Sequence, residues 1–195
     1  MTKSNNTQLL SRFVASFEKL GDLTTYYELD PNAWALSFGD LDEYEMKQWR
    51  PVLCATARSA LDDLYSKIPQ RFPPLYEELL LTYRWAEVDL EMYRLLANPA
   101  GTDLKGIQLE IFRDKCLWKE LIPQGYIQFG KGPDVNYDPV CFDTRRRQKD
   151  DDCRVVQLDH EAILCDRRIR EVAELAPSFR DLVIGTIEVA SRTGA

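Results

Sequence analysis

Residues 125–161 constrain the fold of this chain more than any other segment. Apolar and polar side chains alternate there in three short runs, which two polar loops separate. Alternation with a period of two is typical of β-strands that bury one face, and Gly, Pro, Asp and Asn in the loops are typical of turns. We therefore predict three strands, followed by a helix that begins after Asp159.

The same alternation sorts the side chains of these strands into two faces. One face is apolar and should pack under helices; it comprises Ile127, Phe129, Val140, Phe142, Val156 and Leu158. The other is mixed and comprises Tyr126, Gln128, Cys141, Asp143, Val155 and Gln157. A one-sided antiparallel sheet leaves such a face partly in water. We expect the mixed face to be either the ordinary solvent side of the sheet or a recognition surface.

Helical patterns surround this block. Apolar residues recur at helical spacing over 8–20, over 49–68 with Pro51 in the first turn, and again after Pro74. The order of helices, strand, helices, strands and helix predicts an α+β fold. The other predicted elements are a strand at 92–97, helices near 104–112 and 115–121 with Asp103 and Asp114 as N-caps, and a last helix opened by a capping box at Ser178 and Asp181.

Composition excludes several classes of function. The chain has 25 Lys+Arg against 32 Asp+Glu, a net charge of −7, so no basic excess is present to bind a nucleic acid. The acidic balance suits either a basic protein partner or simple solubility. Five scattered cysteines and one histidine make no zinc set, and no secretory or membrane-spanning run is present. We expect a cytoplasmic protein with free thiols, no cofactor and no membrane contact.

Two reactive or metal-binding motifs can be tested on the residues. Asp134–Asp138 has the spacing of a calcium loop, but Pro139 replaces the required glycine and Arg145 the bidentate glutamate. Cys141, His160 and Asp143 supply the residue types of a nucleophile, its base and an orienting carboxylate. Nothing in the sequence brings those three together, and a histidine between two acids is typically a surface residue.

The run 145–152 joins two of the predicted strands and carries opposite charges, so it is either a solvated hairpin tip or a recognition loop. The candidate partner-binding residues are Asp134, Asp138, Asp143, Asp150, Asp151, Asp152, Tyr126 and Gln128. A second acidic patch comprises Asp40, Asp42, Glu43 and Glu45.

Five segments occur in a familiar order: 72–80 (FPPLYEELL), 125–130 (GYIQFG), 138–143 (DPVCFD), 155–161 (VVQLDHE) and 176–182 (APSFRDL). Together they resemble the SUKH superfamily, which includes the Smi/Knr cell-wall-assembly regulators and the bacterial Syd proteins. The similarity covers about residues 70–183. It implies an α+β domain over 69–195, with a central, mainly antiparallel sheet and helices on one side. Residues 1–68 would then be a helical extension packed on this core in one compact body.

The resemblance also implies a binding role without catalytic residues. Many bacterial members are immunity proteins that neutralise toxins by direct binding, whereas fungal members act as signalling scaffolds. We therefore expect a non-enzymatic binding protein, with a basic toxin domain as its partner. The alternatives are a housekeeping scaffold and an enzyme that uses Cys141 and His160.

Overall fold

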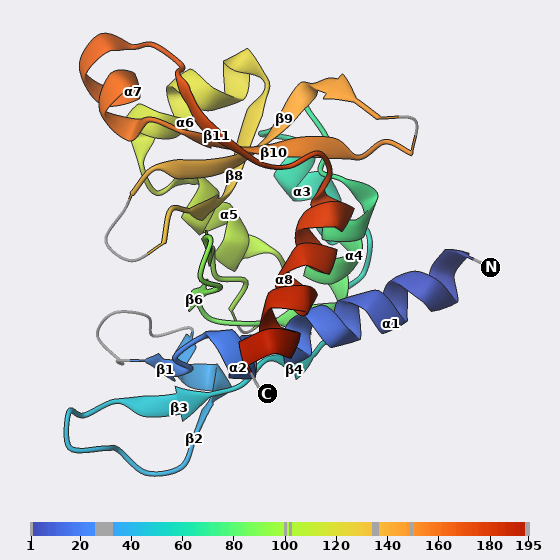
Figure 1. Ribbon diagram of the computed structural model, residues 1–195, viewed down its shortest axis with the longest axis vertical. Helices are drawn as coiled ribbons and strands as arrows, with labels where there is room; N and C mark the ends of the chain where they lie inside the picture. The colour runs from blue at the N-terminus through green and yellow to red at the C-terminus, as the bar shows by residue number, and fades with distance from the viewer. Residues whose placement is uncertain are drawn as a thin grey trace.

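The computed structural model of the chain describes residues 2–25, 33–99, 101, 103–133, 137–148 and 150–193. It has an α+β fold, as the order of the sequence patterns predicts (Figure 1). The helices are α1 (Thr2–Ala15), α2 (Phe17–Leu20), α3 (Ala60–Tyr65), α4 (Pro74–Thr82), α5 (Lys105–Phe112), α6 (Lys115–Leu121), α7 (His160–Asp166) and α8 (Phe179–Thr193), with 3-10 turns η1 (Ala33–Leu36) and η2 (Ile122–Gln124). The strands are β1 (Thr24–Thr25), β2 (Ser37–Phe38), β3 (Lys47–Trp49), β4 (Val52–Leu53), β5 (Tyr83–Arg84), β6 (Val88–Asp89), β7 (Arg94–Leu95), β8 (Tyr126–Lys131), β9 (Pro139–Arg147), β10 (Cys153–Leu158) and β11 (Glu171–Ala176).

A six-stranded antiparallel sheet forms the centre of the fold, in the order β11-β10-β9-β8-β7-β6. Each strand therefore pairs with the next strand of the sheet along the chain, and helices fill the longer connections. A separate three-stranded sheet, β1-β3-β2, lies at the far end of the molecule (Figure 1). The three strands predicted within residues 125–161 are confirmed as β8, β9 and β10.

Aromatic side chains fill the main core between the sheet and the helices. Phe129 of β8 and Phe142 of β9 stack with ring centroids 4.0 Å apart. Tyr76 of α4 and Phe179 of α8 meet both rings edge-on at 5.0–5.8 Å. Offset and edge-on pairs suit the charge distribution of aromatic rings and add to the free energy gained by burial. This cluster fixes α4 and α8 against the same face of the sheet.

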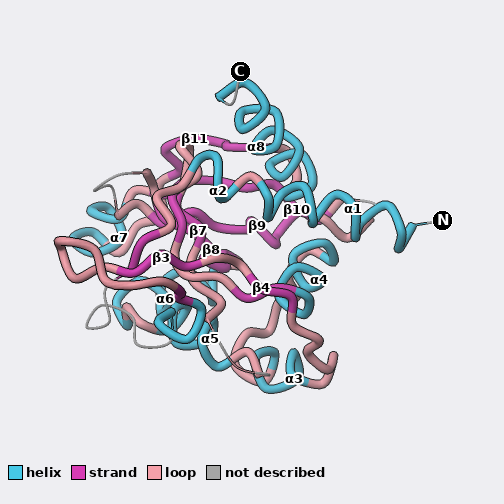
Figure 2. Tube along the Cα trace, turned by 90° about the horizontal axis from the view of Figure 1, so that it is seen from below, coloured by secondary structure: helices cyan, strands magenta, loops and turns pink. Residues whose placement is uncertain are grey.

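Helix α1 belongs to this main core. Its Leu10, Phe13 and Val14 are buried in the same cluster, and the ring of Phe13 lies 6.5 Å from that of Phe179. Figures 1 and 2 both show α1 beside α8. The predicted helix over 8–20 is confirmed, although α1 and α2 divide it at Ser16, and the chain leaves it at Gly21.

The other face of the sheet carries a second, smaller core. Tyr126 and Cys141 pack there with Val156 and Leu158 under α6 and α7. The two faces predicted for β10 are therefore exchanged, because Val155 pairs with Phe142 and is buried in the main core. Adjacent valines leave the alternation undefined, and the pairing of Val155 with Phe142 sets the phase of the strand. The expectation that this face lies partly in water is also wrong for these residues.

The helix predicted over 49–68 is wrong in its first half. Trp49 of β3 lies opposite Ser37, and Val52 of β4 lies opposite Arg84, so only residues 60–65 are helical. A proline disfavours the helical conformation of the residue before it, which here is Arg50. The strand predicted at 92–97 shortens to β7, and β11 was not predicted, since its Glu-Val-Ala-Glu-Leu-Ala sequence favours a helix.

Several predicted helix starts are confirmed. Helix α4 begins at Pro74. The Asp114 carboxylate accepts hydrogen bonds from the backbone N–H groups of residues 116 and 117 at 2.7 and 3.2 Å, as an N-cap does. Ser178 Oγ accepts from the backbone N–H of Asp181 at 3.0 Å. The prediction for Asp103 was one residue early, because Leu104 is the N-cap of α5, although Asp103 accepts from the N–H of Lys105.

Candidate functional site

Asp143 and Tyr126, two predicted partner-binding residues, are buried in an ionic network across β9, β10 and β11. The Asp143 carboxylate accepts hydrogen bonds from Arg145 Nε at 2.8 Å and from Arg154 Nε at 3.0 Å. Burial alone would raise the pKa of Asp143, but these bonds outweigh it and lower the pKa to about 2. Arg154 also donates to Glu171 at 2.7 Å. The network holds three strands together and leaves Asp143 without a surface to offer a partner.

Tyr126 lies beneath this network. The Arg145 guanidinium covers its ring at 4.3 Å, and its hydroxyl donates to Glu171 Oε1 at 3.1 Å. Burial raises the pKa of Tyr126 to about 12, so the phenol stays protonated. Its ring and its hydroxyl are both used inside the chain.

At the hairpin tip between β9 and β10, one acidic residue is buried and two are exposed. Asp152 is buried, and its carboxylate accepts from the N–H groups of Phe179 and Arg180 at 3.1 and 3.2 Å. It therefore caps α8 from a distant part of the chain. Asp150 and Asp151 are exposed, and Asp151 pairs with Arg147 at 3.0 Å. Asp134 lies outside the described residues.

Asp138 and the single histidine form a pair at the start of α7. Asp138 Oδ1 lies 2.7 Å from His160 Nδ1 and accepts the His160 backbone N–H at 3.0 Å. Since Asp138 holds His160 and the arginines hold Asp143, the structure does not assemble Cys141, His160 and Asp143 as a catalytic group. Burial also raises the pKa of the Cys141 thiol well above its usual value, which opposes formation of a thiolate.

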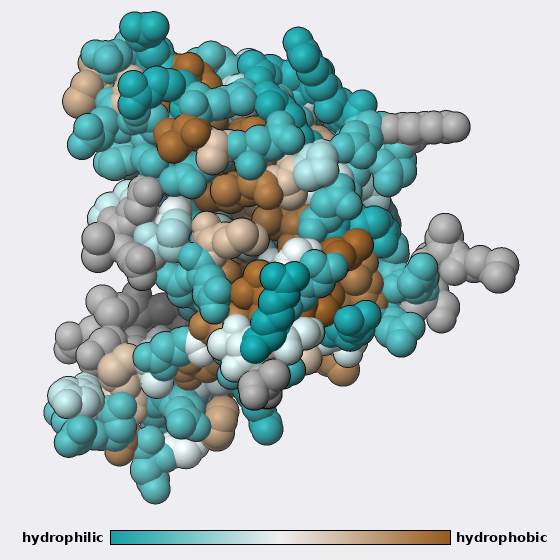
Figure 3. All heavy atoms as spheres, viewed as in Figure 1, coloured by the Kyte–Doolittle hydropathy of each residue, from teal (hydrophilic) through white to brown (hydrophobic). Residues whose placement is uncertain are grey.

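The second acidic patch lies on a projecting hairpin, which we call the acidic hairpin: β2, β3 and the turn 39–46 between them (Figure 1). Asp40, Asp42, Glu43 and Glu45 are all exposed on it. Three large apolar side chains lie among them with high exposed fractions: Phe38 at 43%, Leu41 at 53% and Tyr44 at 66%. Figure 3 shows hydrophilic and hydrophobic residues side by side at the lower end of the molecule, where the acidic hairpin lies. The acids are recognisable in the sequence as a patch, whereas the exposure of the apolar residues between them is not.

Backbone hydrogen bonds shape the turn of the acidic hairpin. Asp42 Oδ1 accepts from the N–H groups of Tyr44 and Met46, each at 2.9 Å, and the Asp42 N–H donates to the Met46 carbonyl at 2.9 Å. Gly39 and Glu45 have φ values of 76° and 60°, which reverse the chain direction. Asp42 is thus a structural residue, whereas Asp40 and Glu43 extend from a turn that is already formed.

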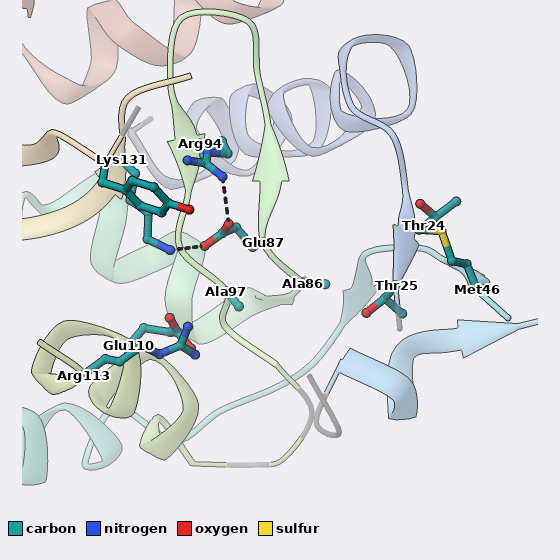
Figure 4. A pocket seen from close by; sticks show the side chains of 11 residues that line it. Thr24, Thr25, Met46, Ala86, Glu87, Arg94, Ala97, Glu110, Arg113 and Lys131 are labelled. Carbon is teal, nitrogen blue, oxygen red and sulfur yellow. Dashed lines mark hydrogen bonds and ion pairs between the residues drawn. The ribbon is translucent and has the colours of Figure 1, made fainter. Parts of the chain in front are cut away.

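A charged groove of about 520 Å³ lies between the small sheet and the edge of the central sheet (Figure 4). Its charged wall carries Glu87, Arg94, Glu110, Arg113 and Lys131, together with Tyr137. Lys131 Nζ donates to Glu87 Oε2 at 2.7 Å, and Arg94 Nη1 lies 3.7 Å from Glu87 Oε1. Thr24, Thr25 and Met46 form the opposite wall.

A second hollow of about 400 Å³ shares Glu110, Arg113, Lys131 and Tyr137 with the charged groove and extends it toward α7. Gln128 and His160 lie in this extension beside three leucines. Of the candidates in the strand block, Gln128 therefore lines a cavity. The basic residues of the groove cannot be recognised from the sequence, because they come from β7, β8 and the end of α5 and have no shared spacing.

Comparisons with protein-family models, with curated proteins and with solved structures gave no match to this chain. Within the described residues, no group of three or more His, Cys, Asp or Glu side chains is arranged to hold a metal ion. The helices in that part of the chain are also too short or too polar to cross a bilayer.

Proposed function

We propose that this chain is a cytosolic protein-binding domain that docks a basic protein through its acidic hairpin. The observation that carries the proposal is the mixture of exposed apolar side chains and carboxylates on one projecting turn. Protein interfaces combine apolar and aromatic anchors at their centre with a polar rim. Phe38, Leu41 and Tyr44 would supply the anchors, and the neighbouring acids would supply the rim.

Charge and rigidity give this surface its selectivity. Asp40, Glu43 and Glu45 would attract a basic partner and repel acidic ones, which raises the association rate at low salt. Because Asp42 already fixes the turn through two backbone N–H groups, little conformational entropy is lost when a partner binds. The partner that these exposed carboxylates favour is therefore a basic protein domain.

The resemblance to the SUKH superfamily supports an immunity-type role for this binding. In that role the partner is a basic toxin domain, which the chain neutralises by covering its surface. Toxins of this kind commonly act on nucleic acids and so present basic surfaces, to which an acidic hairpin is complementary. The net charge of −7 agrees with such a partner.

Co-expression tests the proposal. The protein is produced with the product of the reading frame immediately upstream of its own gene, and growth and co-purification are measured. We expect the pair to co-purify and the chain to relieve the growth defect caused by its neighbour. If the neighbour is harmless or does not bind, the immunity role is excluded.

Charge reversal then tests the surface. We expect Asp40→Lys with Glu43→Lys to abolish co-purification, and binding by the wild type to weaken as salt rises. Asp166→Lys with Glu188→Lys is the matched control, since both residues are exposed elsewhere on the chain and the change in charge is equal. Equal binding by both double variants would exclude the acidic hairpin as the interface.

A further inference from the structure

The charged groove has the size of a small-molecule site. Its two parts measure about 520 and 400 Å³ and share four lining residues, so they adjoin one another. Ligand sites in proteins commonly measure about 300–1,000 Å³. The walls come from distant parts of the chain, which Figure 4 shows meeting around one space.

Basic side chains are concentrated and held in place at the centre of this cavity. Lys131 and Arg94 have side-chain exposures of only 19% and 18%, and Glu87 contacts both cations. Glu110 likewise pairs with Arg113. Carboxylates that hold cations in this way reduce the entropy lost when a ligand binds. With Asp114 they equal the three cations in number, so an anion would be bound through individual donors and not through a net positive charge.

Donors remain available for a ligand. Among the described residues, the Lys131 ammonium makes one hydrogen bond, to Glu87, and the Arg113 guanidinium makes one, to Glu110. An ammonium has three donors and a guanidinium five, so both groups can also donate to an anion. Both residues line the part of the cavity that its two halves share.

The extension toward α7 suits the body of an organic molecule. Leu96, Leu117 and Leu164 supply an apolar wall, while Tyr137 offers a ring. Gln128 and His160 place polar groups at this same part of the cavity. Few polar groups on an apolar wall are the usual means of orienting a small ligand.

We propose that the charged groove binds a small organic anion. Its carboxylate or phosphate group would lie against Lys131 and Arg113, and its planar or apolar body would lie against Leu117 and Leu164. Charge-assisted hydrogen bonds to a carboxylate and to a phosphate share the same chemistry, so the two anions are separated by experiment. This proposal goes beyond the protein-binding role and does not depend on it.

Isothermal titration calorimetry on the full chain tests the site with four probes. Adenosine monophosphate combines a phosphate with a planar body, phenylacetate combines a carboxylate with a ring, and adenosine and inorganic phosphate each supply one part alone. We expect one of the two organic anions to bind with a Kd below about 1 mM, and at least tenfold more tightly than adenosine or phosphate. Failure of both organic anions to bind below about 10 mM would overturn the proposal.

Two variants locate the binding. Arg113→Gln and Lys131→Gln should each weaken the bound anion by roughly tenfold or more, since each removes a charge-assisted hydrogen bond. Arg113 is the safer probe of the two because its side chain is 63% exposed. Arg168→Gln, on an exposed turn after α7, is the control with the same loss of charge. Unchanged affinity in both groove variants would place the ligand elsewhere and overturn the proposal. The double variant Asp40→Lys with Glu43→Lys, on the acidic hairpin, should bind the anion as the wild type does.

Discussion

The acidic residues of the strand block and those of the acidic hairpin look alike in sequence and do different work in the structure. Asp143 and Asp152 are buried, one between two arginines and one at the start of α8. Asp40 and Glu43 are exposed beside Leu41 and Tyr44. The comparison shows that acids of the same type can be held by donors within the chain or left exposed, and only the exposed ones are available to a partner.

Removing Asp143 should give the largest effect. Asp143→Ala leaves Arg145 and Arg154 partly buried without their shared carboxylate. Because both arginines keep Glu171 as a partner, we expect a loss of about 2–3 kcal/mol in the free energy of unfolding, measured by urea denaturation. Asp40→Ala on the acidic hairpin should change it by less than about 0.5 kcal/mol. Equal losses in both variants would remove the distinction between the two regions.

Val156 tests the two-sided burial of the sheet. It is fully buried in the smaller core, on the face where alternation placed Val155. Val156→Ala and Val155→Ala should each destabilise the chain by about 1–3 kcal/mol, because both remove buried methyl groups and leave a cavity. Differential scanning calorimetry would show lower melting temperatures for both. If Val156→Ala leaves the melting temperature unchanged, Val156 is not buried and that face of the sheet is in contact with solvent.

Acid should weaken the ionic network in a defined pH range. The pKa of Asp143 is about 2 in the folded chain, against an ordinary value of 3.8. A lowered pKa stabilises the fold above the ordinary value, and this contribution is lost as pH falls through the folded pKa. The difference is worth about 2 kcal/mol between pH 5 and pH 1. Asp143→Asn should lack this part of the pH dependence; a parallel decline in both proteins would assign it to other acids.

Asp152 should show a smaller effect. Asp152→Ala removes the side chain that accepts from Phe179 and Arg180 at the start of α8. Loss of an N-cap costs about 1–2 kcal/mol. Asp150→Ala, two residues away and exposed, is its control and should be nearly neutral in the same denaturation assay. If the two substitutions cost the same, Asp152 contributes no more than Asp150.

Sequence patterns predicted the elements whose signals are local. The strands of the 125–161 block, the proline start of α4 and the Asp114 cap follow from spacing and capping chemistry, and all are present. The faces of β10 did not follow, because two adjacent valines fit either phase and the pairing of Val155 with Phe142 decides between them. Asp152 as a cap for α8 was also beyond reach, since its partners lie 27 and 28 residues further along the chain.

The candidate site also has features that the sequence reveals and features that only the folded chain reveals. The acids of the acidic hairpin were visible in sequence, but the exposure of Phe38, Leu41 and Tyr44 depends on how the hairpin projects from the fold. The charged groove was invisible, because Arg94, Arg113 and Lys131 meet only after three elements pack together. Tertiary arrangement, not residue type, determines which charged side chains are available to a partner.

The smallest effect on stability and a large effect on binding should coincide at Tyr44. Its side chain is 66% exposed, so Tyr44→Ala should change the free energy of unfolding by less than about 0.5 kcal/mol. An aromatic anchor at the centre of an interface costs about 2 kcal/mol or more when it is truncated, which weakens binding roughly thirtyfold. Affinity for the co-purified neighbour, measured by surface plasmon resonance, checks this. Tyr44→Phe should retain most of the affinity, since the ring remains. If Tyr44→Ala unfolds the chain, the acidic hairpin is structural in the way that Asp143 is. If Tyr44→Ala binds as tightly as the wild type, Tyr44 is not an anchor of the interface.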